Sequence, residues 1–309
     1  MRTKIWLALL ALYVVWGSTY LAIRFAVETI PPFLMAGFRF LISGAILYIW
    51  RRIAGDPTPT PRQWRAAVIV GLLLLLGGNG LVSWAEQHVA SGIAALMVAS
   101  IPLWMVLLDA FRPRGTKPDW KIVLGLLIGF GGIVLLVSSS GGTSSAAGFD
   151  LIALAVLLLA ALIWSYGSLF SRDADLPESS LLGTGIEMLG GALGLFVVGT
   201  LTGEWGQLHL EDISAASAIG LVYLIVFGSL VGFVSYSWLL RNAPIALVST
   251  YAYVNPLVAI FFGAWLGHEL VTNRIVLSGL VIIGSVVVIN WSKQTKTPRP
   301  KEPAPSPAD

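Results

Sequence analysis

Apolar residues run along the chain in long stretches that are separated by short polar segments. A helix that crosses a membrane needs about 20 mostly apolar residues, and runs such as LIALAVLLLAALIW are apolar throughout, without the alternation of barrel strands. The pattern therefore predicts an all-α membrane protein. The ten predicted transmembrane helices cover residues 5–24, 33–50, 65–84, 91–110, 120–138, 150–170, 179–201, 215–238, 247–267 and 274–291.

Composition supports a membrane environment. The chain is 56% hydrophobic and 11% charged, whereas soluble domains average about 45–50% and about 25%. No cysteine is present, which excludes disulfides and thiolate metal sites. The net charge of +3 comes from short clusters between apolar runs, so a nucleic-acid partner is not expected.

Lysine and arginine predict the orientation, because short cytoplasmic loops retain them. A cytoplasmic N-terminus places sixteen of the nineteen basic residues inside; the exceptions are Arg24 and Arg274 at outer helix ends and Arg39 within a span. Both termini are therefore predicted to be cytoplasmic. Residues 292–309 are poor in apolar side chains, which predicts a disordered cytoplasmic tail.

The two halves of the chain resemble each other. A shift of 148 residues aligns Trp16 with Trp164, and a shift of 154 aligns Pro102 with Pro256. These matches divide the chain into repeats at 1–139 and 150–291 with five predicted spans each. Since five is odd, the second repeat enters the membrane from the opposite side, which is the inverted arrangement of many alternating-access transporters.

Two residues with ionisable side chains lie deep in predicted spans. Charge is unfavourable in the membrane interior, so such residues usually have a functional or structural role. Arg39 in the second span and Glu187 in the seventh occupy equivalent repeat positions. They are predicted to contact the carboxylate and amino groups of a zwitterionic substrate, or to pair with each other. A packing ion pair, or an Arg39 that extends to the outer surface, is the alternative.

Prolines and uncharged polar residues add further candidates. Pro102 and Pro256 each remove a helical hydrogen bond at matching places, which predicts a hinge in both halves. Asn255 and Tyr251 share a helix face and are predicted to contact substrate. The remaining candidate substrate contacts are interior aromatic residues and one asparagine, all of which have packing as the alternative: Trp16, Tyr20, Asn79, Trp104 and Trp164.

Glycines and carboxylates complete the predictions. Gly190 and Gly194 have the spacing of close helix contacts. Glu86 and Glu269, at outer ends, and Asp109, at an inner end, are weaker candidates for binding a coupling proton. The histidines show no metal-ligand spacing, and neither a catalytic triad nor a phosphate-loop motif occurs. No catalytic residue, metal or cofactor is therefore predicted.

Three segments resemble the EamA family of the drug/metabolite transporter superfamily, and in particular its bacterial YedA-like members. They are WGSTYLAIRFAVETIPPFLMAGFRF, GNGLVSWAEQHVASGIAALMVASIPLW and STYAYVNPLVAIFFGAWLGHEL. The resemblance implies a ten-helix fold of two five-helix repeats in a bacterial inner membrane, often in an exporter of amino acids or related metabolites. It also implies that the spans of Trp16, Asn79, Trp104 and Trp164 line the central cavity.

The predicted function is alternating-access transport of small metabolites, most simply export of amino acids or related compounds, by a monomer or weak homodimer in contact with membrane lipids. Export of toxic cations or amphiphiles, lipid flipping and a non-transport scaffold are the alternatives. An enzyme is not predicted, because only Arg39 and Glu187 lie deep in spans.

Overall fold

All regular secondary structure is helical in the part of the chain that the computed structural model describes, which is residues 2–112, 117–137, 150–243 and 251–294. The first half contains α1 (Arg2–Ala26), α2 (Pro32–Ile53), α3 (Pro61–Gly71), η1 (Leu72–Gly80), α4 (Leu81–Ala85), α5 (Ser91–Val98), α6 (Ile101–Ala110) and α7 (Trp120–Val137). The second half contains α8 (Leu151–Ser171), α9 (Ser180–Leu201), η3 (Glu204–Gly206), η4 (Leu210–Asp212), α10 (Ala215–Tyr223), η5 (Leu224–Val231), α11 (Gly232–Asn242), α13 (Tyr251–Trp265) and α14 (Asn273–Gln294).

The helical prediction is confirmed, and helices occupy every predicted span. Within the described residues, seven helical stretches are long and apolar enough to cross a membrane, and three further apolar helices are shorter. The number of spans and their inverted orientation remain predictions. Helix α14 continues to Gln294, past the predicted start of the tail; the rest of the tail and residues 247–250 of the ninth span lie outside the described residues.

Side-chain caps fix where several helices begin. Thr60 and Gln63 form a reciprocal capping box before α3, in which each side chain accepts a hydrogen bond from the other residue's backbone N–H. Before α8, Asp150 Oδ1 accepts the backbone N–H of Ile152 at 2.8 Å. Such caps satisfy N–H groups that have no partner inside the helix.

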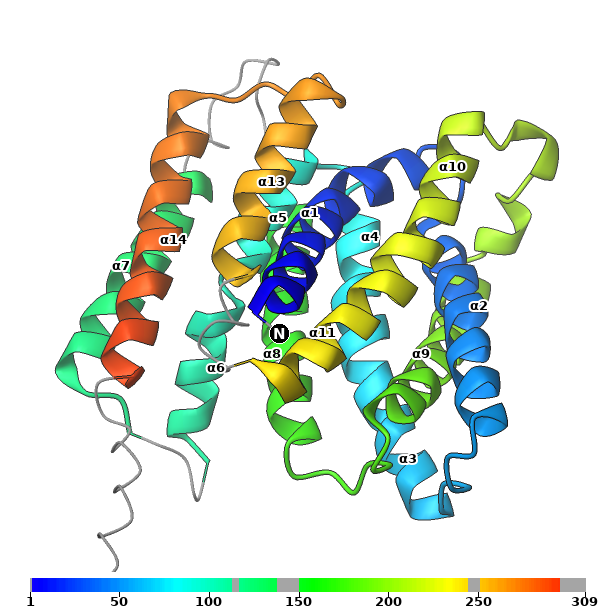
Figure 1. The fold of residues 1–309 in the computed structure, drawn as a ribbon. Coiled ribbons are helices and arrows are strands. Elements are labelled where there is room, and N and C mark those ends of the chain that lie inside the picture. Colours follow the sequence, from blue (N-terminus) through cyan, green and yellow to red (C-terminus); the bar gives the residue numbers. More distant parts are fainter. Residues whose placement is uncertain (1, 113–116, 138–149, 244–250, 295–309) are drawn as a thin grey trace, which may run out of the picture.

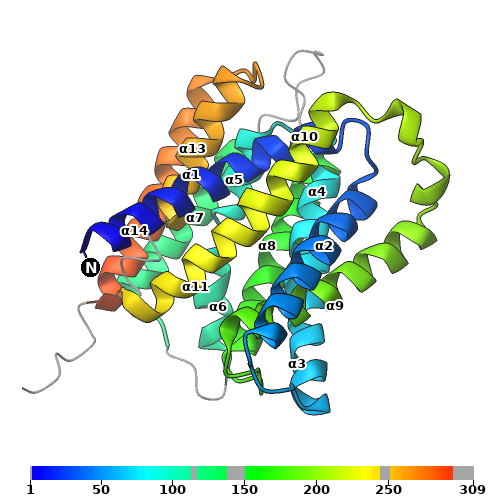
Figure 2. The same ribbon diagram turned by 45° about the vertical axis from the view of Figure 1, so that its right-hand side comes forward.

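Helices from the two halves pack against each other. Helix α2 lies along α9, whereas α7 and α14 form a pair on the other side of the molecule (Figures 1 and 2). The approach of α2 to α9 depends on glycines, because a Cβ atom on Gly44 would lie 2.9 Å from the carbonyl oxygen of Gly185. The predicted close contacts of Gly190 and Gly194 are confirmed, since these glycines lie against Val68 and Leu72.

The bundle has two ends, which we call the upper and lower ends after Figure 1. At the upper end α1 ends, α5 begins, and residues 266–272 connect α13 to α14. At the lower end α2 gives way to α3 and α8 to α9. A ligand that crosses the molecule along its helices would pass from one of these ends to the other.

Candidate functional site

A cavity of about 120 Å³ lies between helices of both halves. Helices α1, α2, α8, α11 and α13 contribute to its walls, together with η1 and neighbouring residues of α4, α5 and α6. Seven of the nine predicted substrate contacts line it: Trp16, Tyr20, Arg39, Asn79, Trp164, Tyr251 and Asn255. Whether they touch a substrate remains a prediction.

Aromatic rings cluster around Trp16 at this cavity. Its ring centroid lies 5.4 Å from that of Phe233, 5.3 Å from Tyr236 and 5.2 Å from Tyr251. The indole Nε1 of Trp16 donates to the backbone carbonyl of Gly228 at 3.1 Å, which fixes the ring. The result is an apolar wall with exposed ring faces, suited to an aliphatic, aromatic or weakly hydrated cationic group.

Among the described residues that line the cavity, Arg39 is the one with a charged side chain. It is only 4% exposed, and its Nε donates to Ser229 Oγ at 2.9 Å. The guanidinium carbon also lies 4.7 Å from the ring centroid of Phe40. Among the described residues, no carboxylate forms an ion pair with Arg39. Its remaining N–H groups are thus placed to bind an anionic group from a ligand.

Two asparagines supply neutral polar groups. Asn79 lies on η1, and Asn255 lies on α13 beside Pro256. Asn255 is buried, and its Oδ1 accepts no hydrogen bond from any residue that the structure describes. A buried acceptor without a partner is unfavourable, so a donor from a ligand would remove that penalty.

Wide π-helical turns occur in both halves at the cavity. Segment η1 interrupts the third predicted span and carries Gly78 and Asn79, whereas η5 interrupts the eighth and carries Gly228 and Ser229. These residues line the cavity or hold Trp16 and Arg39. π-Helical turns are rare and frequently lie at functional sites, and the sequence offers no signal for them.

Two of the predicted substrate contacts lie elsewhere. Trp104 packs on Phe130 with ring centroids 4.9 Å apart, and it does not line the cavity. Glu187 lies on α9 away from the cavity and forms no ion pair with Arg39. The ion pair that was one of the predicted roles of these two residues is therefore absent from the structure.

The two prolines have different surroundings. Pro102 is the second residue of α6, after turn residues Ala99 and Ser100 that separate it from α5. Pro256 instead lies inside α13, which continues to Trp265. The fourth span is thus broken near its proline, whereas the described part of the ninth is one helix. The hinge role of both residues remains a prediction.

Sequence reasoning missed several residues at the cavity. Phe233 and Thr19 line it, and Ser229 orients Arg39 without being a predicted site residue. Phenylalanine, threonine and serine are common throughout apolar spans, so composition does not distinguish these positions. Their common signal is proximity to Trp16 and Arg39 in space, which only the packing of α1 and α2 against η5 and α11 reveals.

Polar contacts join several helices at the upper end. Arg24 Nη1 donates to Glu269 Oε1 at 2.6 Å. The same carboxylate accepts the backbone N–H of Ser91 at 2.8 Å and that of Gly92 at 3.1 Å, at the start of α5. Glu269 therefore ties together α1, α5 and the connection from α13 to α14. Carboxylates at a helix N-terminus are stabilised by its unpaired N–H groups and dipole.

A second carboxylate anchors α2 in the same manner. Glu204, in η3, accepts the backbone N–H groups of Phe33 at 3.2 Å and Leu34 at 2.9 Å. Burial raises the pKa of this carboxyl group above its usual value, although the two N–H donors act in the opposite direction. Buried glutamates thus fasten two helices at the upper end.

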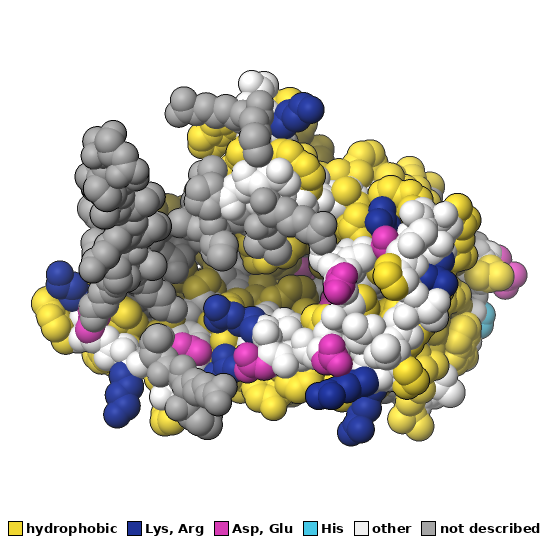
Figure 3. All heavy atoms as spheres, turned by 60° about the horizontal axis from the view of Figure 1, so that its bottom comes forward, with side chains coloured by type: hydrophobic (Ala, Val, Ile, Leu, Met, Phe, Trp, Pro, Cys, Tyr) yellow, Lys and Arg dark blue, Asp and Glu magenta, His cyan; other side chains and the backbone are white. Residues whose placement is uncertain are grey.

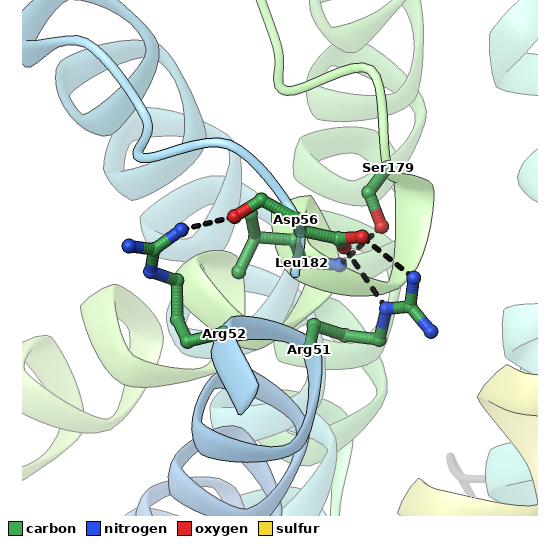
Figure 4. A network of polar contacts seen from close by, with 5 residues as sticks. All are labelled: Arg51, Arg52, Asp56, Ser179 and Leu182. Atoms are coloured by element: carbon green, nitrogen blue, oxygen red, sulfur yellow. Dashed lines mark hydrogen bonds and ion pairs between the residues drawn. The ribbon is translucent and has the colours of Figure 1, made fainter. Parts of the chain in front are cut away.

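The lower end differs in character. Seen from below, the molecule is hollowed at its centre, with apolar side chains in the hollow and charged side chains around it (Figure 3). At one side, Asp56 accepts hydrogen bonds from Arg51 Nε at 2.9 Å and Nη2 at 2.6 Å (Figure 4). Ser179, before α9, also contacts Asp56. These bonds, chiefly from Arg51, lower the pKa of Asp56 to about 2, so the network stays ionised at neutral pH.

Comparison with known proteins places this architecture in a family. The model of the EamA-like transporter family matches residues 3–138 and 151–291. Inner membrane transporter YedA of Escherichia coli K12 is 38% identical over 288 residues, covering 93% of this chain and 90% of YedA. Transporter YoaV of Bacillus subtilis is 24% identical, covering 90% of this chain and 94% of YoaV.

A solved crystal structure has the same fold. Its chain superposes with a TM-score of 0.63 at 20% identity, covering 94% of this chain and 99% of that chain. The family match spans most of the sequence, and both it and the apolar helices agree with a multi-pass protein of the inner membrane. The chain belongs to the EamA-like transporter family.

Proposed function

We propose that this protein carries small metabolites with a carboxylate group, most simply amino acids and related zwitterions, out of the cytoplasm by alternating access. The observation that carries the proposal is Arg39, a buried guanidinium that lines an aromatic cavity and has no carboxylate partner among the described residues. An unpaired buried charge is unfavourable, and a substrate carboxylate would neutralise it.

The rest of the cavity suits the remainder of such a substrate. Asn255 Oδ1 offers an acceptor for an ammonium group, and the ring faces of Trp16 and Tyr251 attract cations and apolar groups. Organic cations without an anionic group are disfavoured, because the one charged residue among the described residues of the cavity lining is positive. The same argument separates this proposal from export of toxic cations.

Alternating access follows from the predicted inverted repeats and from the difference between the two ends. With the predicted cytoplasmic N-terminus, the upper end is periplasmic and the hollowed lower end is cytoplasmic, which supports the proposal of an inward-facing state. Opening the upper end requires Arg24 and Glu269 to separate. The break before Pro102 and the wide turns of η1 and η5 are the proposed places where helices bend.

Counterflow in proteoliposomes tests the proposal. Vesicles loaded with an unlabelled amino acid are diluted into the same radiolabelled compound, across a panel that includes amino-acid amides and organic cations. We expect saturable accumulation for at least one amino acid and little for its amide, since the amide lacks the anionic group. Accumulation equal to that of empty liposomes across the panel, or a preference for the cations, would contradict the proposal.

A further inference from the structure

Glu86 is a buried carboxylate that the proposed binding of substrate does not use. The residue is 2% exposed, and neither carboxylate oxygen accepts a hydrogen bond of normal geometry from the described residues. The backbone N–H of Arg24 comes near but does not reach that geometry. Buried ionised carboxylates are normally paired or hydrogen-bonded, so this environment favours the protonated form.

The position of Glu86 connects the cavity to the upper end. Its backbone N–H donates to the carbonyl of Val82, a cavity residue one helical turn below. On α1, Arg24 likewise follows the cavity residue Tyr20 by one turn. Glu86 and the pair of Arg24 with Glu269 therefore form the layer that separates the cavity from the upper surface.

Charged and titratable groups from three other elements act on Glu86. Arg24 and Tyr20 belong to α1, Arg39 to α2, and Glu269 to the connection between α13 and α14. Arg24 already forms an ion pair with Glu269, with 2.6 Å between Nη1 and Oε1. While the upper end is closed, an ionised Glu86 would face a second carboxylate. Of the two arginines that act on it, Arg24 is paired with Glu269, and Arg39 donates to Ser229 and lines the cavity, where the proposed substrate carboxylate binds.

We propose that Glu86 is a proton-binding site, and that a proton on its carboxyl group holds the upper end closed. When Arg24 and Glu269 separate, water reaches Glu86, which ionises and gains Arg24 as a counter-ion. The closed state therefore binds one more proton than the open state. By linkage, acidic external pH favours closure and alkaline external pH favours opening. The inference rests on the proposed alternating access and on the predicted orientation.

Cysteine labelling tests this inference without any substrate, and the chain has no cysteine that would interfere. The reporter is Ile23→Cys, a buried position that lines the cavity. A membrane-impermeant thiol reagent is added from the periplasmic side at mildly acidic and mildly alkaline pH. Gly206→Cys, at a position with open space around it, is the reference. Its labelling rates give the pH dependence of the thiol reaction without any change in access.

With Glu86 present, we expect the alkaline-to-acid ratio of labelling rates at Ile23→Cys to exceed that of the reference by about threefold or more. Glu86→Gln, which resembles the protonated side chain, should remove the excess and slow labelling at both pH values. Glu86→Asp should keep an excess, and so should Glu28→Gln, which neutralises an exposed carboxylate at the same end. Tryptophan fluorescence verifies that each variant is folded.

The outcomes separate this inference from the proposed function. No excess with Glu86 present, or an equal excess in Glu86→Gln, overturns the proton site and leaves the counterflow prediction untouched. If Ile23→Cys is never labelled from the periplasmic side although Gly206→Cys is, both proposals fail, because no outward-open state is then reached.

Discussion

Arg39→Gln will lower counterflow of amino acids by about 100-fold, because truncating one partner of a buried, hydrogen-bonded charge pair costs about 3 kcal/mol. Glutamine removes the charge and keeps much of the side chain's volume. The same variant should reduce the wild-type preference for an amino acid over its amide, since the group that distinguishes them is absent. Counterflow kinetics for both compounds measure this preference.

Glu187→Gln is the matched control for this prediction. Glu187 lies at the equivalent place in the second predicted repeat and carries a carboxyl group, but it does not line the cavity. It should therefore keep the wild-type preference for acid over amide. The contrary outcome is a loss of transport in both variants, with the residual activity of Arg39→Gln still showing the wild-type preference for acid over amide. Arg39 would then not be the residue that contacts the carboxylate.

Gly71→Ala will strongly destabilise the protein. A Cβ atom at Gly71 would lie 2.0 Å from the backbone carbonyl oxygen of Glu187, so α3 and α9 must separate. Because no flexible side chain is available to move, we expect a loss on the order of 3 kcal/mol or more, at or above the upper range for overpacking. Thermal unfolding in detergent, followed by the fluorescence of the twelve tryptophans, measures the effect.

Gly131→Ala supplies the comparison. Gly131 lies on α7, where a Cβ atom meets nothing within 4 Å. Alanine there should leave stability unchanged or raise it by up to ~1 kcal/mol through its helix propensity. Equal unfolding temperatures for Gly71→Ala and Gly131→Ala would contradict the close packing of α3 against α9 at Gly71.

The helices were predictable because the thickness of the membrane imposes a long apolar run on every crossing segment. What hydropathy leaves open is the rotation of each helix about its axis. Spans such as α9 are apolar on nearly all sides. Hydropathy therefore does not indicate whether the side of α9 that carries Glu187 faces the cavity. For the same reason, hydropathy does not indicate that Trp104 lies away from the cavity. Trp16 and Tyr20, on α1, both line it.

Other features depend on contacts between distant segments. The π-helical turns of η1 and η5 change the register of every side chain that follows them, and their sequences, LLLLLGGNG and LIVFGSLV, read as ordinary apolar helix. Similarly, the sequence places Glu86 and Glu269 at outer helix ends but does not reveal their partners. Glu269 caps α5, 177 residues away from Gly92 along the chain, and Glu86 is buried beside it.

Alternating access is the central claim, and reversible crosslinking of the upper end tests it most directly. Cysteines replace Arg24 and Glu269, whose side chains are in contact, and a short bifunctional thiol reagent with a reducible link joins them. We predict that crosslinking stops the counterflow of the double variant and that reduction restores it, since the upper end must open in every cycle. Counterflow that continues unchanged after complete crosslinking would contradict the account.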